Sequence, residues 1–307
     1  MARSTPLLSE RASGLLVGLA AGNALGLPAE PLATAAAIAG RFPDGLHDII
    51  REDTPESPFD DDTALAVILA EELASPPLDF ATVAHRWVDW ARQDGRGIGD
   101  WTARALNHIA THDSPPASTG GVATNGALTR CLPIALVAFG SPRNLVSATF
   151  HAAALTHPDP RCTWGAVAVN VAAARLLQAS RDFLPDVIEA LQANDAPAEL
   201  LSAIRRVPVI EFAELPIEGE EGRGAVAAAQ IALWTAHHEP ILERGLTRLA
   251  NAGGDTDTNA ALAGALLGAR DGEAAIPARW LSQIPQVSHL RSLATQLARV
   301  TKERTSP

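Results

Sequence analysis

Apolar residues along the chain recur mainly at three- and four-residue spacing, the period of an amphipathic helix. Ser9 is a favourable N-cap for a first helix that extends to about Gly26, and Pro28 ends it. The same pattern predicts further helices at about Asp62–Leu73, Phe80–Arg92, Asn144–Leu155, Thr163–Ala179, Pro185–Gln192, Ala196–Arg206, Gly224–His237, Pro240–Asn251, Thr258–Ala269 and Val287–Lys302. In the second of these, Val83, Trp87 and Trp90 share one face.

The segments between these helices are polar. Pro43–Pro58 and Thr111–Thr124 are rich in Pro, Gly, Asp, Ser and Thr and are predicted as long loops, which in compact proteins are often functional. Alternation of period two is nearly absent, and residues 207–212 alone hint at a strand. With no fixed-period repeat, the pattern predicts one all-α domain over residues 1–307, with its core at about 9–302.

Four glycines of the first helix, Gly14, Gly18, Gly22 and Gly26, follow each other at four-residue spacing. That spacing places them on one helix face, where another helix can approach closely. Arg3 and Arg11 before an apolar run give a superficial likeness to a signal peptide. The uninterrupted apolar run looks too short to span a bilayer, so no membrane segment is expected.

Composition narrows the class of protein. Hydrophobic residues make up 47% of the 307 residues but aromatic residues only 4%, so the apolar content is mainly Ala, Leu and Val, which favours closely packed helices. The net charge of -11 and the lack of a Lys/Arg cluster argue against nucleic-acid binding. Two cysteines provide neither a disulfide framework nor a CxxC pair, which suits a reducing, cytoplasmic setting.

Two acidic clusters stand directly before apolar helices. Asp60, Asp61 and Asp62 precede one of them, and capping needs only a single Asp. Asp255, Asp257 and Thr258 follow a Gly-Gly turn before the other. The second cluster briefly resembles a calcium loop, but Ala260 and Leu266 occupy the positions where such a loop needs Gly and Glu.

If these two helix N-termini meet, the clusters form one all-oxygen site. Such ligands suit Mg²⁺, Ca²⁺ or Mn²⁺ rather than zinc. The residues themselves leave the reaction open.

Four segments, in the same order, resemble those of the ADP-ribosylglycohydrolase family, the group around dinitrogenase reductase-activating glycohydrolase and the ADP-ribosylarginine and ADP-ribosylserine hydrolases. They are residues 18–30, the AspAspAspThrAla of 60–64, the AsnGlyAlaLeuThrArgCysLeuPro of 125–133, and residues 253–269 with IleProAlaArgTrp of 276–280. The match spans about residues 14–285, and the segment at 253–269 is the most specific.

The resemblance implies an all-α orthogonal bundle with two divalent metal ions, Mg²⁺ or Mn²⁺, at the bottom of an ADP-ribose cleft. The positions that match metal ligands are Asp60, Asp61, Asp62, Asp255, Asp257 and Thr258. Glu30 matches a glutamate beside the metals and the ribose. Glu30, Asp61 and Asp257 are therefore the expected catalytic residues.

The resemblance also implies where the substrate binds. Asn125 and Gly126 match a phosphate and ribose loop, and Gly120, Gly121 and Val122 resemble its backbone-amide donors. His157 matches a residue near the bound ADP-ribose. The expected partners are ADP-ribose and an ADP-ribosylated protein or small molecule, and a monomer is favoured.

The sequence departs from the family pattern at four positions. Asn23 replaces the Asp of Gly-Asp-Ala, Asp60 replaces Thr or Ser, and Thr129 replaces the Met of a Met-Arg pair. Gly97 occupies the place of an Asp in the Asp-Ile-Gly of several arginine-specific members, so arginine specificity stays open.

The expected activity is metal-dependent hydrolysis at the ribose C1″ carbon. Two alternatives remain: a non-catalytic relative that binds ADP-ribose, and a hydrolase of O-acyl-ADP-ribose or another nucleoside-like molecule.

Overall fold

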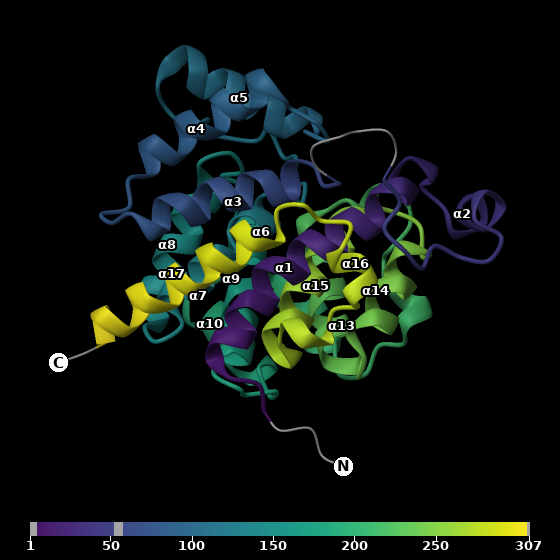
Figure 1. Cartoon of the computed structure of the whole chain (residues 1–307). Coiled ribbons are helices and arrows are strands. Elements are labelled where there is room, and N and C mark those ends of the chain that lie inside the picture. The colour runs from purple at the N-terminus through teal and green to yellow at the C-terminus, as the bar shows by residue number, and fades with distance from the viewer. Residues whose placement is uncertain (1–4, 52–57, 306–307) are drawn as a thin grey trace.

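The computed structural model describes residues 5–51 and 58–305, and every regular element in this part of the chain is helical (Figure 1). In chain order the elements are α1 (Leu8–Gly26), η1 (Leu27–Leu32), α2 (Ala35–Arg41), α3 (Asp61–Ala74), α4 (Phe80–Gln93), α5 (Asp100–His112), α6 (Gly126–Arg130), α7 (Pro133–Ala138), α8 (Pro142–Ala154), α9 (Pro160–Leu177), α10 (Leu184–Ala193), α11 (Ala198–Arg206), η2 (Phe212–Glu214), α12 (Gly219–Gly222), α13 (Ala225–His238), α14 (Leu242–Ala250), α15 (Thr256–Asp271), η3 (Glu273–Ala275), α16 (Ala278–Leu281) and α17 (Val287–Thr305). The η elements are 3₁₀ helices.

The all-α prediction is confirmed, and the predicted helices are present with ends shifted by a few residues. The strand hinted at 207–212 is wrong. There the chain makes a turn in which the N–H groups of Val209 and Ile210 both bond to the carbonyl of Arg206, and η2 follows. Pro208 has no N–H to donate, and Val209 is 76% exposed, so the segment has neither the ladder nor the buried face of a strand.

The predicted loops agree with the structure where it describes them. Residues 43–51 of the loop Pro43–Pro58 are irregular, while residues 52–57 lie outside the described part of the chain. The loop predicted from Thr111 begins just after α5, whose last residue is His112. In the described part of the chain, six short or medium α-helices were not predicted, namely α2, α5, α6, α7, α12 and α16.

The glycine face of α1 packs antiparallel against α15, and Figure 1 shows the two helices side by side in the middle of the molecule. A Cβ atom on Gly14, Gly18, Gly22 or Gly26 would overlap the backbone of Gly268, Gly264, Ala260 or Thr256, respectively. The overlap is reciprocal, since a Cβ on Gly264 would meet the carbonyl of Gly18. The predicted close approach is confirmed, and it forces the C-terminal end of α1 to lie beside the N-terminal end of α15.

By length and hydropathy, Leu8–Leu32 could cross a membrane, so the expectation that its apolar run is too short for this was wrong. In the structure, 83% of this apolar window is buried inside the fold. Burial on all sides is what the core helix of a globular protein requires, and it explains why the helix is apolar all round.

One contiguous cluster of buried apolar side chains extends from Ala12 to Leu297. The face predicted for α4 is confirmed, because Val83 and Trp87 are fully buried in the core cluster and Trp90 is partly buried and packs against that cluster. Helices α4 and α5 lie beyond α3 at one end of the bundle (Figure 1). The N-termini of α3, α5 and α15 and the residues just after α1 then converge on one cavity.

Candidate active site

The two acidic clusters come together because of the α1–α15 interface. At its end, the Thr256 hydroxyl donates to the carbonyl of Gly26 at 2.8 Å, which fixes the start of α15 against the end of α1. Asn23, one turn earlier in α1, links the two clusters, since its Nδ2 lies 2.9 Å from Asp60 Oδ1 and 3.5 Å from Asp257 Oδ2.

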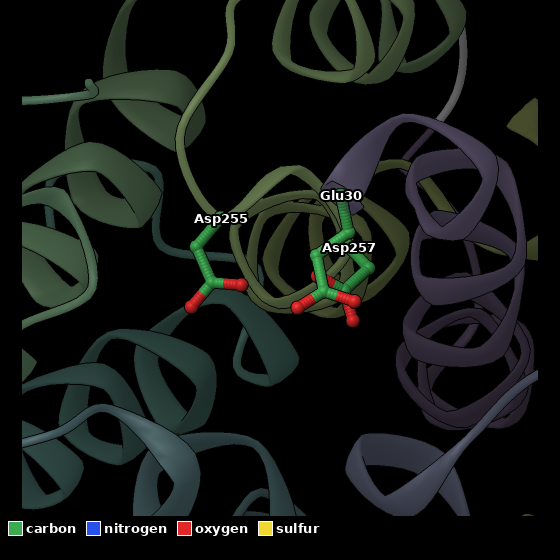
Figure 2. A group of neighbouring side chains, drawn as sticks. All are labelled: Glu30, Asp255 and Asp257. Atoms are coloured by element: carbon green, nitrogen blue, oxygen red, sulfur yellow. The ribbon is translucent and has the colours of Figure 1, made fainter. Parts of the chain in front are cut away.

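The carboxylates form two groups that share one residue. Oxygens of Asp60, Asp62 and Asp257, which we call the inner set, lie within 4.8 Å of one another. Oxygens of Glu30, Asp255 and Asp257, the outer set, satisfy the same limit. Figure 2 shows the outer set, with Glu30 coming from the segment after α1 and its carboxylate close to that of Asp257. Asp257 therefore stands between two possible cation positions.

Neutral donors orient these carboxylates. The hydroxyls of Thr129 and Thr258 donate to the two oxygens of Asp62 at 2.7 and 2.8 Å. Asn125 Nδ2 donates to Asp255 Oδ2 at 2.7 Å. Thr129, which replaces the Met of the family pattern, thus positions one carboxylate by a direct hydrogen bond.

Burial makes the cluster reluctant to carry its full negative charge. Burial, and then the charge of Asp60, raises the pKa of Asp62 to about 7. Burial also raises the pKa of Asp61 and Asp257 well above the ordinary carboxyl value, with neighbouring carboxylates adding to the effect. Like charges this close cannot all be ionised at low cost unless a cation lies among them.

The donor set fits a hard divalent cation. Asp257 Oδ1 is buried without a hydrogen-bond partner, although buried carboxylate oxygens are normally paired. Carboxylate oxygens are also what Mg²⁺ and Mn²⁺ prefer. Asp61 belongs to neither set. Its Oδ2 lies 3.8 Å from Arg130 Nη2, and its side chain lines the cavity.

A cavity of about 280 Å³ opens above the carboxylates. Its walls are formed by residues from six stretches of the chain, namely Glu30, Asp61, Asp62, Gly97, Gly99, Asp100, Trp101, Thr102, Arg104, Val122, Thr124, Asn125, Gly126, Arg223, Asp255, Asp257 and Thr258. A larger cavity of about 850 Å³ between α8, α9 and α10 has mostly apolar walls and contains no predicted site residue. The smaller cavity is therefore the candidate active site.

The predicted substrate residues are placed unequally around this cavity. Val122, Asn125 and Gly126 line it, whereas Gly120 and Gly121 lie in the same loop with φ values of +64° and +91° but are not among the lining residues. His157 is fully buried behind the loop.

The ring nitrogens of His157 pair with the hydroxyls of Thr124 and Thr156 at 3.0 and 2.9 Å. Burial, and then the charge of Arg130, lowers the pKa of His157 well below its usual value. The imidazole is therefore neutral at neutral pH and supports the loop from behind.

Three of the departures from the family pattern touch each other. Asn23 donates to Asp60, and a Cβ on Gly97 would overlap the Asp60 carboxylate. Gly97 also has φ of +73°, a conformation that favours glycine. The added carboxylate at position 60 thus occupies space that a side chain at position 97 would otherwise fill.

Sequence reasoning missed several cavity residues. Asp100, Trp101 and Arg104 belong to α5, which was not predicted, and Arg223 lies in no recognisable motif. For α5 a signal was present, because Thr102, Ala105, Leu106 and Ile109 are buried at helical spacing. For Arg223 there was none, since its nearest carboxylate partner, Glu30, is 193 residues away.

The chain is similar over nearly its whole length to known proteins of one family. Residues 4–307 match the family described as ADP-ribosylglycohydrolase. The chain is 30% identical to the ADP-ribosyl-[dinitrogen reductase] glycohydrolase of Rhodospirillum rubrum over 295 residues, which cover 91% of this chain and 92% of that one. It is 28% identical to the ADP-ribosylarginine hydrolase Tri1 of Pseudomonas putida, covering 94% and 78%. A solved structure named ADP-ribosylglycohydrolase-related protein complex superposes with a TM-score of 0.80 at 30% identity, covering 96% and 99%.

Proposed function

Since this chain belongs to the ADP-ribosylglycohydrolase family, we propose that it is a hydrolase that releases ADP-ribose from a modified target by cleaving the bond at ribose C1″. We further propose that it requires divalent cations, Mg²⁺ or Mn²⁺. The observation that carries this proposal is Asp257, which is shared by both carboxylate sets and has a buried oxygen with no hydrogen-bond partner.

The residues that would hold the cations are those of the two sets. Asp60, Asp62 and Asp257 would hold one cation, and Glu30, Asp255 and Asp257 the other. When bound, such cations neutralise the carboxylates and lower the pKa of water in the site. Asp61 and the Thr258 hydroxyl lie beside the sets and complete the oxygen-rich wall.

Glu30 is the proposed general base. Its side chain is 29% exposed and lines the cavity, so a water molecule can reach it. Burial, followed by the charges of Asp255 and Asp60, raises its pKa, which brings the carboxylate closer to the strength a base needs. Glu30 takes a proton from water, the water oxygen bonds to C1″, and the bond from C1″ to the target breaks. The leaving nitrogen or oxygen of the target takes up a proton from solvent, and Glu30 returns its own proton to solvent, so that one water molecule is consumed.

The remaining residues bind the substrate or stabilise the transition state. Positive charge develops on the ribose in the oxocarbenium-like transition state, and Asp61 and Asp257 lie where they can stabilise it. In the loop from Gly120 to Gly126, the N–H groups of Gly120, Val122 and Asn125 already donate to Ser118, Thr119 and Arg223. The diphosphate would bind to the other N–H groups of this loop, near the start of α6. His157 acts on the substrate only through this loop.

The test is release of free ADP-ribose from arginine-, serine- and acetyl-linked ADP-ribose, each with Mg²⁺, with Mn²⁺ and with a chelator. Cation-dependent release from at least one linkage supports the proposal and identifies the linkage. Release that is equal in the chelator would contradict the cation requirement.

A second candidate is an ADP-ribose-binding protein without hydrolysis. The contact between Asn23, Asp60 and Gly97 favours it, because it places the departures from the family pattern directly at the inner set. Tight binding of ADP-ribose, measured by calorimetry, with no turnover of any linkage would identify this function and exclude the first.

A further inference from the structure

Arg223 places a positive charge at one half of the carboxylate cluster. Its Nη1 lies 3.3 Å from Glu30 Oε1 and 4.0 Å from Asp255 Oδ1. Two of the three members of the outer set are therefore within ion-pair distance of one guanidinium group. In the part of the chain that the structure describes, the other arginine paired with an active-site carboxylate is Arg130, whose partner Asp61 belongs to neither set.

The inner set has no basic side chain this close in the part of the chain that the structure describes. Among the described residues, no ion pair connects Asp60, Asp62 or Asp257 to a basic side chain. The side-chain hydrogen bonds that they receive from residues outside the set come from the neutral groups of Asn23, Thr129 and Thr258. Among the described residues, the inner set thus has no basic side chain at ion-pair distance, and it contains the carboxylate of Asp257, whose buried Oδ1 has no hydrogen-bond partner.

The guanidinium group of Arg223 can leave without disturbing the fold. The backbone of this residue is fixed, because its carbonyl accepts a hydrogen bond from the N–H of Asn125 at 3.2 Å and Gly224 bridges to Thr124. Its side chain, by contrast, is 46% exposed, and its one hydrogen bond to a described residue is to Glu30.

We infer that Arg223 is a built-in counter-cation of the outer set, so that the two cation positions are not equivalent. The inner set binds a divalent cation first. A second cation binds at the outer set only when the Arg223 guanidinium is displaced from Glu30 and Asp255. This inference rests on the proposed function in one respect, namely that the carboxylate cluster binds divalent cations.

The test is a titration of the metal-free, full-length protein with Mn²⁺, with free Mn²⁺ followed by electron paramagnetic resonance. Arg223→Gln removes the charge and keeps a polar side chain, whereas Arg223→Lys keeps the charge. Arg279→Gln is the matched control. Its side chain is also 46% exposed and paired with two carboxylates, Asp48 and Glu243, away from the site.

For the wild type we expect one tight and one weak binding event. In Arg223→Gln the weak event should tighten by about tenfold or more, because an opposing charge within about 4 Å is removed, and the tight event should change less. Arg223→Lys should keep the weak event weak, and Arg279→Gln should leave both events as they are in the wild type.

Two results would overturn the inference in different ways. If the weak binding event has the same Mn²⁺ affinity in Arg223→Gln as in the wild type, Arg223 is not a counter-cation of the outer set. The cation requirement would still stand. If the wild type binds no Mn²⁺ at all, the metal part of the proposed function fails together with the inference.

Discussion

Along most of their length α1 and α15 touch through glycine backbones, whereas at one end of the same pair several carboxylates crowd together. The interface contains no charge between Gly14 and Gly22 on the α1 side and none between Ala260 and Gly268 on the α15 side. A few ångströms further on, Asp257 is buried among like charges. Close packing stabilises the first region, and electrostatic repulsion destabilises the second.

The difference shows how the fold can hold a strained site. Carboxylates that repel one another would separate if their backbones were free to move. The glycine contacts leave no room for α1 and α15 to shift, so the start of α15 stays where Asn23 and Thr256 fix it. The packed region therefore sets the geometry, and the acidic region carries the chemistry.

The largest effect on activity is expected from a substitution in the acidic region. Asp257→Ala removes the carboxylate shared by both sets, and we expect ADP-ribose release to fall by at least roughly 100-fold, since the charge stabilisation lost amounts to several kcal/mol. Without cations the variant should unfold at the same or a higher temperature than the wild type, because a source of repulsion is gone.

Asp89→Ala, at an exposed position of α4, is the control for this substitution and should retain activity. Full activity in Asp257→Ala would rule out a role for this carboxylate.

The next largest effect, on stability, is expected from a substitution in the packed region. Gly18→Ala places a Cβ against the carbonyl of Gly264, and we expect a loss of about 1–3 kcal/mol in the free energy of unfolding. Cation affinity should fall as well, because the start of α15 shifts. Urea unfolding and a Mn²⁺ titration measure the two effects.

Gly40→Ala makes the same chemical change in α2, where nothing lies within 4 Å of the new atom. There a gain of about 0.5–1 kcal/mol is expected, since glycine is a poor helix former. Equal effects at the two positions would show that helix propensity, rather than close packing, governs Gly18.

The smallest expected effect is a change in the melting temperature with pH, which originates in the acidic region. The pKa of Asp62 is raised in the folded protein to about 7, so the folded state holds its proton more tightly than the unfolded state. The corresponding stability is present below the ordinary carboxyl pKa and is lost as pH rises through about 7. In a chelator, the melting temperature should therefore fall by roughly 5 °C between pH 5 and pH 8.

Added Mg²⁺ should reverse this fall at pH 8 and have little effect at pH 5. Asp62→Asn, which cannot ionise, should show a smaller fall. An equal fall in Asp62→Asn and the wild type would assign the pH dependence to other groups.

Most helices long enough to show a period could be predicted from the sequence, and so could the glycine face of α1. The 13-residue helix α5 was missed, although its buried residues follow helical spacing. The two acidic clusters were also visible, because three adjacent Asp residues exceed what capping needs. Helix α6 could not be predicted in the same way, since its five residues cover little more than one turn. Its start within a Gly- and Thr-rich stretch also resembles a loop.

The parts of the site that depend on long-range contacts were not predictable. The pairing of Arg223 with Glu30 and the position of Asn125 against Asp255 arise when distant helices pack, and no local pattern records them. The direction in which a side chain points is equally hard to predict from the sequence, and His157 is an example. It was expected beside the substrate, and the structure buries it behind the loop.

The antiparallel pairing of α1 with α15 also affects how the chain folds while it is being synthesised. Gly26 and its partner Thr256 are 230 residues apart. At a synthesis rate of about 5–20 residues per second, α1 leaves the ribosome roughly ten to fifty seconds before its partner exists. During that interval the face of α1 that packs on α15 has no native cover, so the nascent chain is exposed to aggregation until α15, in roughly the last sixth of the chain, is made.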